Sequence, residues 1–243
     1  MSLDHALLHQ RPRYPGSVNP KVESPLPTSI SDLKFWFSAK SITGKSDGDS
    51  VTQWDDLSGN GLHATEATYA PLYYSSVING LPGLRFGSHA NTKLSISSTT
   101  QTYMSVFVVV YILAKSVSYP IVYQEDNINT GIVILSNNQS YWSFRYATTT
   151  YSAPSATYVS GQPNILTMRL GSIPVGYYDG AAVAGGAVIG AERSKTHTIG
   201  NANDNSRQTN GYIGELFAFD RVITNDELIK MHTYLSKAWN ITI

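Results

Sequence analysis

The sequence predicts an all-β fold, an antiparallel β-sandwich that ends in one α-helix. Short runs rich in β-branched and aromatic residues, about a dozen in all, follow one another at close spacing and are separated by Gly, Asn, Asp and Ser. Charged residues make up only 14% of the chain, whereas it holds 16 Tyr and 19 Gly, a composition that suits strands joined by polar turns. No strand pattern alternates with a helical one, which argues against a parallel α/β sheet.

Composition limits the classes of function. A chain of 243 residues can bury a substantial core. The 17 basic and 17 acidic residues balance, so no basic surface argues for nucleic acid. The absence of cysteine excludes disulfides and thiolate metal sites. The sequence has no apolar run of membrane-spanning length, so we expect no membrane insertion. It has no secretory signal peptide, so we expect the protein to be assembled in a cytoplasm.

Residues 1–30 differ from the rest of the chain because they hold five of its 11 prolines. Proline fixes φ and removes an amide donor, so we expect an extended N-terminal arm with little regular structure. We interpret it as a docking arm that binds other subunits of a larger assembly, and an arm folded back on its own domain is the alternative. The segment expected to dock consists of Arg11, Pro12, Arg13, Tyr14 and Pro15. Residues 31–243 then form the globular domain.

The segment 51–63 predicts a rigid corner at the start of the domain. Trp54 is a large apolar residue at the end of a predicted strand, and a turn follows it. Gly59, Asn60 and Gly61 tolerate positive φ. The short side chains of Asp56 and Ser58 can bond to nearby backbone amides. We therefore expect a structural corner rather than a ligand contact.

Two further elements follow from local patterns. The run 104–113 is the most apolar in the chain and predicts a central strand that is buried on both faces. Thr224 and Glu227 have the spacing of a capping box, which predicts a helix over 225–239. Asn240 is a plausible stop signal. The helix has one apolar face, formed by Leu228, Met231, Leu235 and Trp239.

Two separated motifs carry a resemblance to a known family. The first reads G-D-x-V-x-x-W-x-D-x-S-G-N-G and comprises Gly48, Asp49, Val51, Trp54, Asp56, Ser58, Gly59, Asn60 and Gly61. The second comprises Gly211, Ile213, Glu215, Phe219, Asp220, Arg221, Glu227, Tyr234, Leu235, Lys237, Ala238 and Trp239, with one extra residue before the tryptophan. Together they resemble laminin-G-like, concanavalin A-like lectin/glucanase domains of bacterial and phage proteins. The resemblance implies a jelly-roll sandwich over roughly 31–241. That family includes sugar binders, adhesion modules and purely structural domains.

The sequence does not predict an enzyme. It has no G-x-S-x-G, H-E-x-x-H or P-loop motif, and it lacks the E-x-D-x-x-E triple of glucanases that share the fold. Glu125 and Asp126 are adjacent, so they would point to opposite faces of a strand. Glu215 lies among apolar residues, and we interpret it as a buried structural ion paired with Arg85 or Arg169. The alternative interpretation is a perturbed catalytic acid.

Two loops are candidates for binding sugar, because sugar sites combine aromatic rings with Asn, Asp and Gln. One, 124–130, lies next to Tyr123, and the other is the Asn-rich segment 200–210. The side chains of both could equally serve only to turn the chain. The tentative ligand-binding residues are Tyr123, Asp126, Asn127, Asn201, Asn203, Asp204, Asn205 and Arg207. The resembled family often binds calcium in rim loops, but no calcium ligand set can be assigned here. We expect no cofactor and no metal.

These observations lead to one expectation about function. The chain should be a non-catalytic structural or adhesion module, a phage virion component such as a capsid decoration, fibre or tail-associated protein. Residues 1–30 would anchor it in an oligomeric assembly, and the lectin-like sandwich would contact cell-surface glycans of the host. The alternatives are a glycan-degrading hydrolase or lyase with a degenerate motif, and a cement protein without a ligand.

Overall fold

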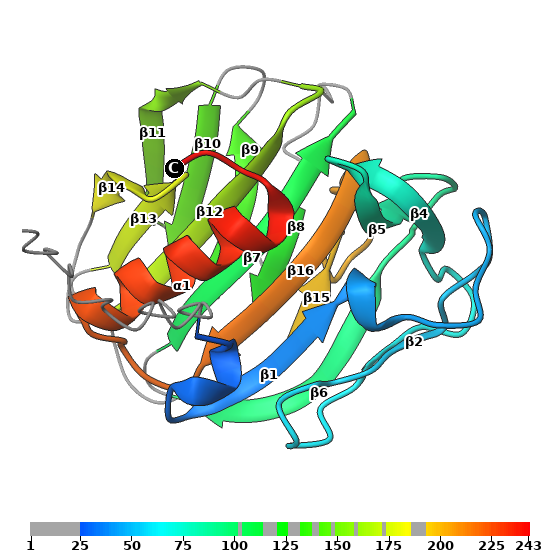
Figure 1. Ribbon diagram of the computed structural model, residues 1–243, viewed down its shortest axis with the longest axis horizontal. Coiled ribbons are helices and arrows are strands. Elements are labelled where there is room, and N and C mark those ends of the chain that lie inside the picture. Colours follow the sequence, from blue (N-terminus) through cyan, green and yellow to red (C-terminus); the bar gives the residue numbers. More distant parts are fainter. Residues whose placement is uncertain are drawn as a thin grey trace, which may run out of the picture.

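The protein forms two antiparallel sheets that pack face to face (Figure 1). The computed structural model describes residues 25–101, 104–113, 121–125, 132–137, 141–146, 149–157, 160–171, 174–185 and 193–243. Sheet A contains β1 (Leu33–Ser38), β4 (Leu72–Ile78), β5 (Leu81–Phe86), β7 (Met104–Ile112), β12 (Pro163–Leu170), β13 (Pro174–Tyr178), β14 (Ala181–Gly185) and β16 (Gly211–Phe219). Sheet B contains β2 (Gln53–Trp54), β3 (Ala64–Thr65), β6 (Leu94–Gln101), β8 (Ile121–Glu125), β9 (Ile132–Asn137), β10 (Tyr141–Tyr146), β11 (Thr149–Thr157) and β15 (Arg193–Ile199).

The helices of the described residues are few and short. Two 3₁₀ turns, η1 (Pro27–Ser29) and η2 (Ala39–Ser41), flank β1, and α1 (Asn225–Trp239) follows the last strand. This architecture confirms the predicted antiparallel β-sandwich with one C-terminal helix; the finer jelly-roll, laminin-G-like assignment stays a prediction. None of the described helices has the length and hydrophobicity that a bilayer-spanning helix needs.

Strand β7 lies at the centre of the core. All of its residues are buried except Tyr111, which is half-buried. Helix α1 covers one face of the strand, where Phe107 contacts His232 with ring centroids 5.6 Å apart. Sheet B covers the other face, so β7 is buried on both sides over most of its length, as predicted, whereas Leu113 at the end of the predicted run is exposed.

Strand β16 is paired differently along its two halves. On the side away from β7, Gly211–Ile213 pairs with β5, and the stretch from Glu215 to Phe219 pairs with β1. The register shifts at Gly214, where a Cβ would approach the Trp239 ring to 2.6 Å. The close contact at this glycine lets the end of α1 lie directly on the sheet.

Asp56 holds the corner that connects β2 to β3 in sheet B. One carboxylate oxygen accepts hydrogen bonds from the amides of Trp36 and Ser58, both at 2.9 Å, and the other accepts one from the Leu62 amide at 3.0 Å. Asn60 donates to the carbonyl of Leu33 at 2.7 Å, which ties the same loop to β1. These bonds replace a regular ladder in the turn.

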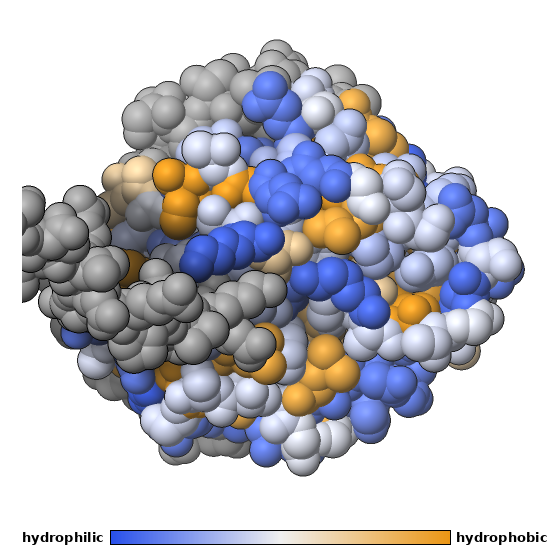
Figure 2. All heavy atoms as spheres, viewed as in Figure 1, coloured by the Kyte–Doolittle hydropathy of each residue, from blue (hydrophilic) through white to orange (hydrophobic). Residues whose placement is uncertain are grey.

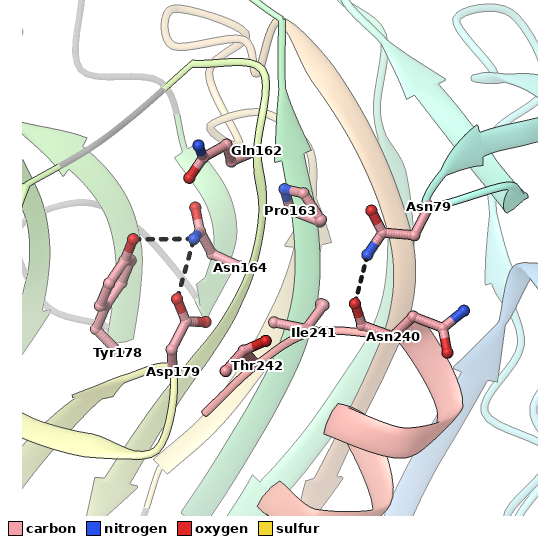
Figure 3. A pocket seen from close by; sticks show the side chains of 9 residues that line it. All are labelled: Asn79, Gln162, Pro163, Asn164, Tyr178, Asp179, Asn240, Ile241 and Thr242. Atoms are coloured by element: carbon pink, nitrogen blue, oxygen red, sulfur yellow. Dashed lines mark hydrogen bonds between the residues drawn. The ribbon is translucent and has the colours of Figure 1, made fainter.

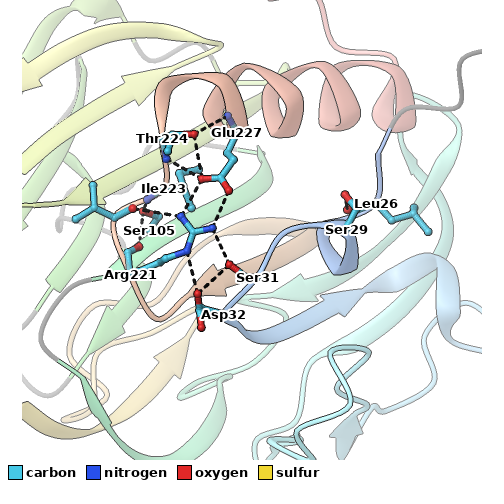
Figure 4. Close-up of polar contacts among 10 residues, drawn as sticks. Leu26, Ser29, Ser31, Asp32, Ser105, Arg221, Ile223, Thr224 and Glu227 are labelled. Carbon is cyan, nitrogen blue, oxygen red and sulfur yellow. Dashed lines mark hydrogen bonds and ion pairs between the residues drawn. The ribbon is translucent and has the colours of Figure 1, made fainter.

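Helix α1 begins with the predicted capping box. The Thr224 side chain accepts from the Glu227 amide, and the Glu227 carboxylate accepts from the Thr224 amide at 2.8 Å. Arg221 donates to the same carboxylate at 2.7 Å and to Asp32 at 3.1 Å, as Figure 4 shows. The helix ends at Asn240, which has a left-handed conformation with φ 53°. The N-terminus of α1 is therefore bonded to the start of the domain.

Candidate functional site

The Asn-rich loop after β15 uses most of its polar groups internally. The buried side chain of Asn201 accepts hydrogen bonds from the amides of Ala202 and Arg207 at 2.8 and 3.2 Å. Asn203 accepts a bond from the Thr198 hydroxyl, and its amide donates to Gln124 at 3.3 Å. These contacts fix the loop against sheet B rather than presenting its amides to a ligand.

Two other residues of this loop have similar local roles. The Asp204 carboxylate accepts bonds from the hydroxyl and amide of Ser206, which lower its pKa. Asn205 has φ 62° and accepts a bond from Lys93 at 2.9 Å. Asn203 and Asp204 remain exposed, so ligand binding by this loop stays a prediction.

Tyr123 is not a surface platform. Its side chain is fully buried between the sheets, with the hydroxyl 2.7 Å from Nδ1 of His197 and the ring 6.5 Å from that of Phe35. The prediction that its ring meets sugar is wrong, because its position on β8 points it into the core. Asp126 and Asn127 lie outside the described residues, as do residues 11–15.

Glu215 is a buried structural carboxylate with partners other than those predicted. It accepts hydrogen bonds from Trp36 Nε1 and Tyr234 OH, both at 2.7 Å, and from Trp239 Nε1 at 2.5 Å. Burial raises its pKa, and these donors and Lys40 oppose that shift. The carboxylate joins β16, β1 and α1.

The two predicted arginine partners of Glu215 lie elsewhere. Arg85 donates to Asn210 at 2.7 Å, and Arg169 donates to Asn225 at 2.7 Å. The prediction of an arginine partner is therefore wrong. Sequence alone could not find the tryptophan and tyrosine donors, because they come from a strand and a helix that only the fold brings together.

A polar cavity with a volume of about 270 Å³ lies at one end of sheet A. We call it the polar pocket (Figure 3). Four separate segments form its wall: the β4–β5 turn, the start of β12, the β13–β14 turn and the tail after α1. Its lining residues are Asn79, Gln162, Pro163, Asn164, Tyr178, Asp179, Asn240, Ile241 and Thr242.

Three of these residues have left-handed backbone conformations. Asn79, Asp179 and Asn240 have φ of 51°, 43° and 53°. Asn and Asp adopt this region more readily than other residues with a Cβ, and such conformations gather at functional sites. Asn79 also donates to the carbonyls of Trp239 and Asn240 at 2.9 and 2.8 Å, which fixes the tail against the β4–β5 turn.

A hydrogen-bond network fixes one side of the pocket. The Asn164 amide group donates to Tyr178 OH at 2.9 Å and to Asp179 Oδ2 at 3.1 Å, and the Ile165 amide donates to Asp179 Oδ1 at 2.7 Å. Burial raises the pKa of Asp179, and its bonds to Ile165, Asn164 and Tyr178 act against that rise. Burial also raises the pKa of the Tyr178 hydroxyl.

Three other polar groups of the pocket have no hydrogen bond within the described residues and can bind a ligand. Within the described residues, no hydrogen bond involves the side chains of Gln162 or Thr242, or the amide oxygen of Asn164. The pocket thus offers a fixed carboxylate, amides that donate and accept, and two hydroxyls. Such a set suits a small ligand rich in hydroxyl groups.

The pocket also limits the chemistry available. Asp179 supplies the one carboxylate among its lining residues. The described residues contain no group of three or more His, Cys, Asp or Glu side chains that could hold a metal ion. This pocket could not be predicted from the sequence, because its residues come from four distant segments. The one local signal is the dipeptide Asp179-Gly180, which is typical of a turn and does not indicate a pocket.

No known family model and no curated protein matches the chain. Its fold is similar to domain 4 of AbnA, a GH43 extracellular arabinanase from Geobacillus stearothermophilus solved with arabinotriose, at a TM-score of 0.60 and 13% identity. That alignment covers 83% of this chain and 98% of the domain.

Two other solved structures are similar at low identity. The binding domain of botulinum neurotoxin DC, solved with rat synaptotagmin II, matches at a TM-score of 0.60 and 12% identity over 84% of this chain and 52% of that one. Trypanosoma rangeli sialidase, solved with sialic acid, matches at a TM-score of 0.58 and 12% identity. The alignment covers 86% of this chain and 33% of the sialidase chain. This chain therefore spans about a third of the sialidase. These likenesses show the β-sandwich fold alone.

Proposed function

We propose that this protein is a non-catalytic carbohydrate-binding module that holds a sugar residue in the polar pocket. The observation that carries the proposal is the network of Asn164, Tyr178 and Asp179, which fixes a carboxylate and an amide beside unbonded polar side chains. A sugar has hydroxyl groups that both donate and accept, so fixed acceptors and donors can select its orientation. The arabinotriose complex of the similar arabinanase domain supports the same ligand class.

The dimensions of the pocket suit a small ligand. Ligand sites usually measure about 300–1,000 Å³, and the polar pocket of about 270 Å³ lies just below that range. A single sugar ring is therefore a better match than a larger ligand held entirely inside the cavity. Desolvated hydrogen bonds to Asp179 would contribute most of the selectivity, because bonds to a charged acceptor are the stronger ones.

The non-catalytic part of the proposal rests on the carboxylates. Glycoside hydrolysis generally needs two carboxyl groups flanking one bond, whereas Asp179 is the one carboxylate of the pocket lining. Glu125 and Glu215 are fully buried. Release of reducing sugar from a polysaccharide panel, lost on Asp179→Asn, would support the alternative of a glycan-degrading enzyme instead.

The test is direct measurement of sugar binding by calorimetry, after a glycan array has identified a ligand. Gln162→Ala and Thr242→Val should each weaken binding several-fold to tenfold, where tenfold corresponds to about 1.4 kcal/mol. Neither side chain has a hydrogen bond within the described residues, so the melting temperature should not change. Gln53→Ala, at an exposed glutamine of β2, is the control. Absence of any glycan ligand, or equal binding by all variants, would contradict the proposal.

We also propose that residues 1–30 attach the module to a larger assembly, with a virion as the expected setting. The support is the proline-rich composition of that segment. Removing residues 1–24 should leave a folded domain that no longer joins the assembly. Light scattering on the full chain and on the shortened one tests whether the segment also drives self-association.

A further inference from the structure

A row of large side chains crosses the outer face of sheet A just beyond the end of α1. Tyr111 on β7 lies opposite Tyr212 on β16, and Tyr212 lies opposite Arg85 on β5. Tyr74 on β4 contacts Tyr212, with ring centroids 5.7 Å apart. We call these four residues the tyrosine row.

The end of the helix explains why this row is accessible. Trp239, the last helical residue, lies over Gly214, so α1 covers β16 from that point toward its C-terminal end. Tyr212 lies on the uncovered side, and all four residues of the row are only half-buried. The rings are held by their neighbours: Tyr111 lies 6.1 Å from Tyr212, and the Arg85 guanidinium lies 5.7 Å from the Tyr212 ring.

The row continues from the polar pocket. Pro163, which lines the pocket, is the register partner of Tyr111. A Cβ at Gly161 would lie 4.0 Å from the Tyr111 hydroxyl, and Gln162, the next residue, lines the pocket. With strands about 4.8 Å apart, the path from Pro163 to Arg85 crosses three spacings, or about 14 Å. That length matches a short oligosaccharide.

One cation, Arg85, lies in the row and one anion, Asp47, lies near it, and their charges act in opposite directions on the pKa of Tyr212. Nη1 of Arg85 has no hydrogen-bond partner within the described residues. Arg85 donates to Asn210 at 2.7 Å, and Asp47 accepts a bond from the Ser75 amide at 2.7 Å. On the coloured part of the face seen in Figure 2, the apolar residues occur in small separate groups between hydrophilic ones, so this part of the surface lacks the broad apolar area typical of protein interfaces. Aromatic faces with polar edges and nearby charges of opposite sign suit an uncharged sugar chain, whose apolar ring faces can stack on tyrosine.

We propose that the tyrosine row is a binding platform that extends the polar pocket, so that the ligand is a neutral glycan chain of several sugar residues. This inference rests on the proposed function. It adds that affinity depends on the length of the glycan. The pocket holds one sugar residue, and Tyr111 and Tyr212 contact the sugar residues that follow it.

The test compares affinity with chain length by calorimetry, using neutral arabino-, xylo-, cello- and malto-oligosaccharides of increasing length and acidic oligogalacturonides. For the series that binds, wild-type affinity should rise at least tenfold from the monosaccharide to the tetrasaccharide. Tyr111→Ala and Tyr212→Ala should remove most of that rise and leave monosaccharide affinity unchanged. Tyr212→Phe keeps the ring and should keep most of the rise, which controls for misfolding of the alanine variants.

The matched control is Tyr69→Ala, which removes a 38% exposed tyrosine outside the row and should change nothing. Affinity that is independent of chain length, or tighter binding of the acidic series, would overturn the platform while leaving the pocket proposal intact. Failure of every sugar to bind would overturn both.

Discussion

At the residue scale, Glu215 shows how a carboxylate can be structural inside an apolar core. One of its oxygens accepts from Trp36 and Tyr234, and the other accepts from Trp239. An indole N–H can only donate. Lys40 lies 4.7 Å from the Trp239 ring centroid and donates to the carbonyl of Ala238, which places a positive charge beside the buried anion. The site therefore requires an acceptor at both oxygen positions.

Replacing that acceptor tests the structural role. In Glu215→Gln the new NH₂ group must face an indole N–H in either orientation, so one buried donor loses its partner. We expect a loss of about 1–3 kcal/mol in the free energy of unfolding, measured by denaturant titration. Glu66→Gln, at a carboxylate whose bonded partners are the Thr68 and Tyr69 amides, is the control and should change stability by less than about 0.5 kcal/mol. Full stability combined with loss of a glycan-cleaving activity would instead show a catalytic role.

At the element scale, α1 depends on its first turn. Glu227 accepts from Arg221 and from the Thr224 amide, and Arg221 also reaches Asp32 at the start of the domain (Figure 4). The contacts with Arg221 are the largest cause that lowers the pKa of Glu227 from 4.5 to about 2. Because the folded pKa is the lower one, the stabilisation is complete above the unfolded value. It is lost as pH falls through the range from 4.5 toward about 2.

This capping arrangement gives two expected results. Thr224→Ala should cost about 1 kcal/mol, the usual value for a lost N-cap. In Glu227→Gln, the melting temperature should fall less between pH 4.5 and about 2 than it does in the wild type. The effect should be modest, because the pair is partly exposed and solvent screens it. Asp226→Asn, in the same turn, controls for the helix dipole; an equally small fall there would contradict the assignment to Glu227.

At the scale of the whole molecule, local patterns predicted the parts that are built locally. The capping box, the Asp56 corner and the two-sided burial of β7 each follow from neighbouring residues. The tyrosine row and the polar pocket could not be predicted, because they depend on strand register and on four segments that meet only in the fold. The error over Tyr123 has the same origin. All five residues of β8 are buried, and whether both faces of a strand are covered depends on the elements that pack on it rather than on its own pattern.

The packing of the two sheets gives the last prediction. Gly176 on β13 faces Phe144 on β10, and a Cβ there would lie 2.2 Å from the ring, so the sheets can approach this closely only over a glycine. Gly176→Ala must move the ring or separate the sheets, and should cost about 1–3 kcal/mol of stability. Phe144→Leu alone should also destabilise, because it removes a buried ring.

The double variant decides whether the contact is the cause. When Phe144→Leu is present, the alanine at position 176 has room. The loss of unfolding free energy in the double variant should therefore be smaller than the sum of the losses in the two single variants. We expect this difference, the coupling energy, to be about 0.5–3 kcal/mol in denaturant titrations. Strictly additive losses would mean that the sheets are not in contact at this point. The pocket residues Tyr178 and Asp179 follow Gly176 on the same strand and turn, so we expect sugar affinity to fall with Gly176→Ala and to recover in the double variant.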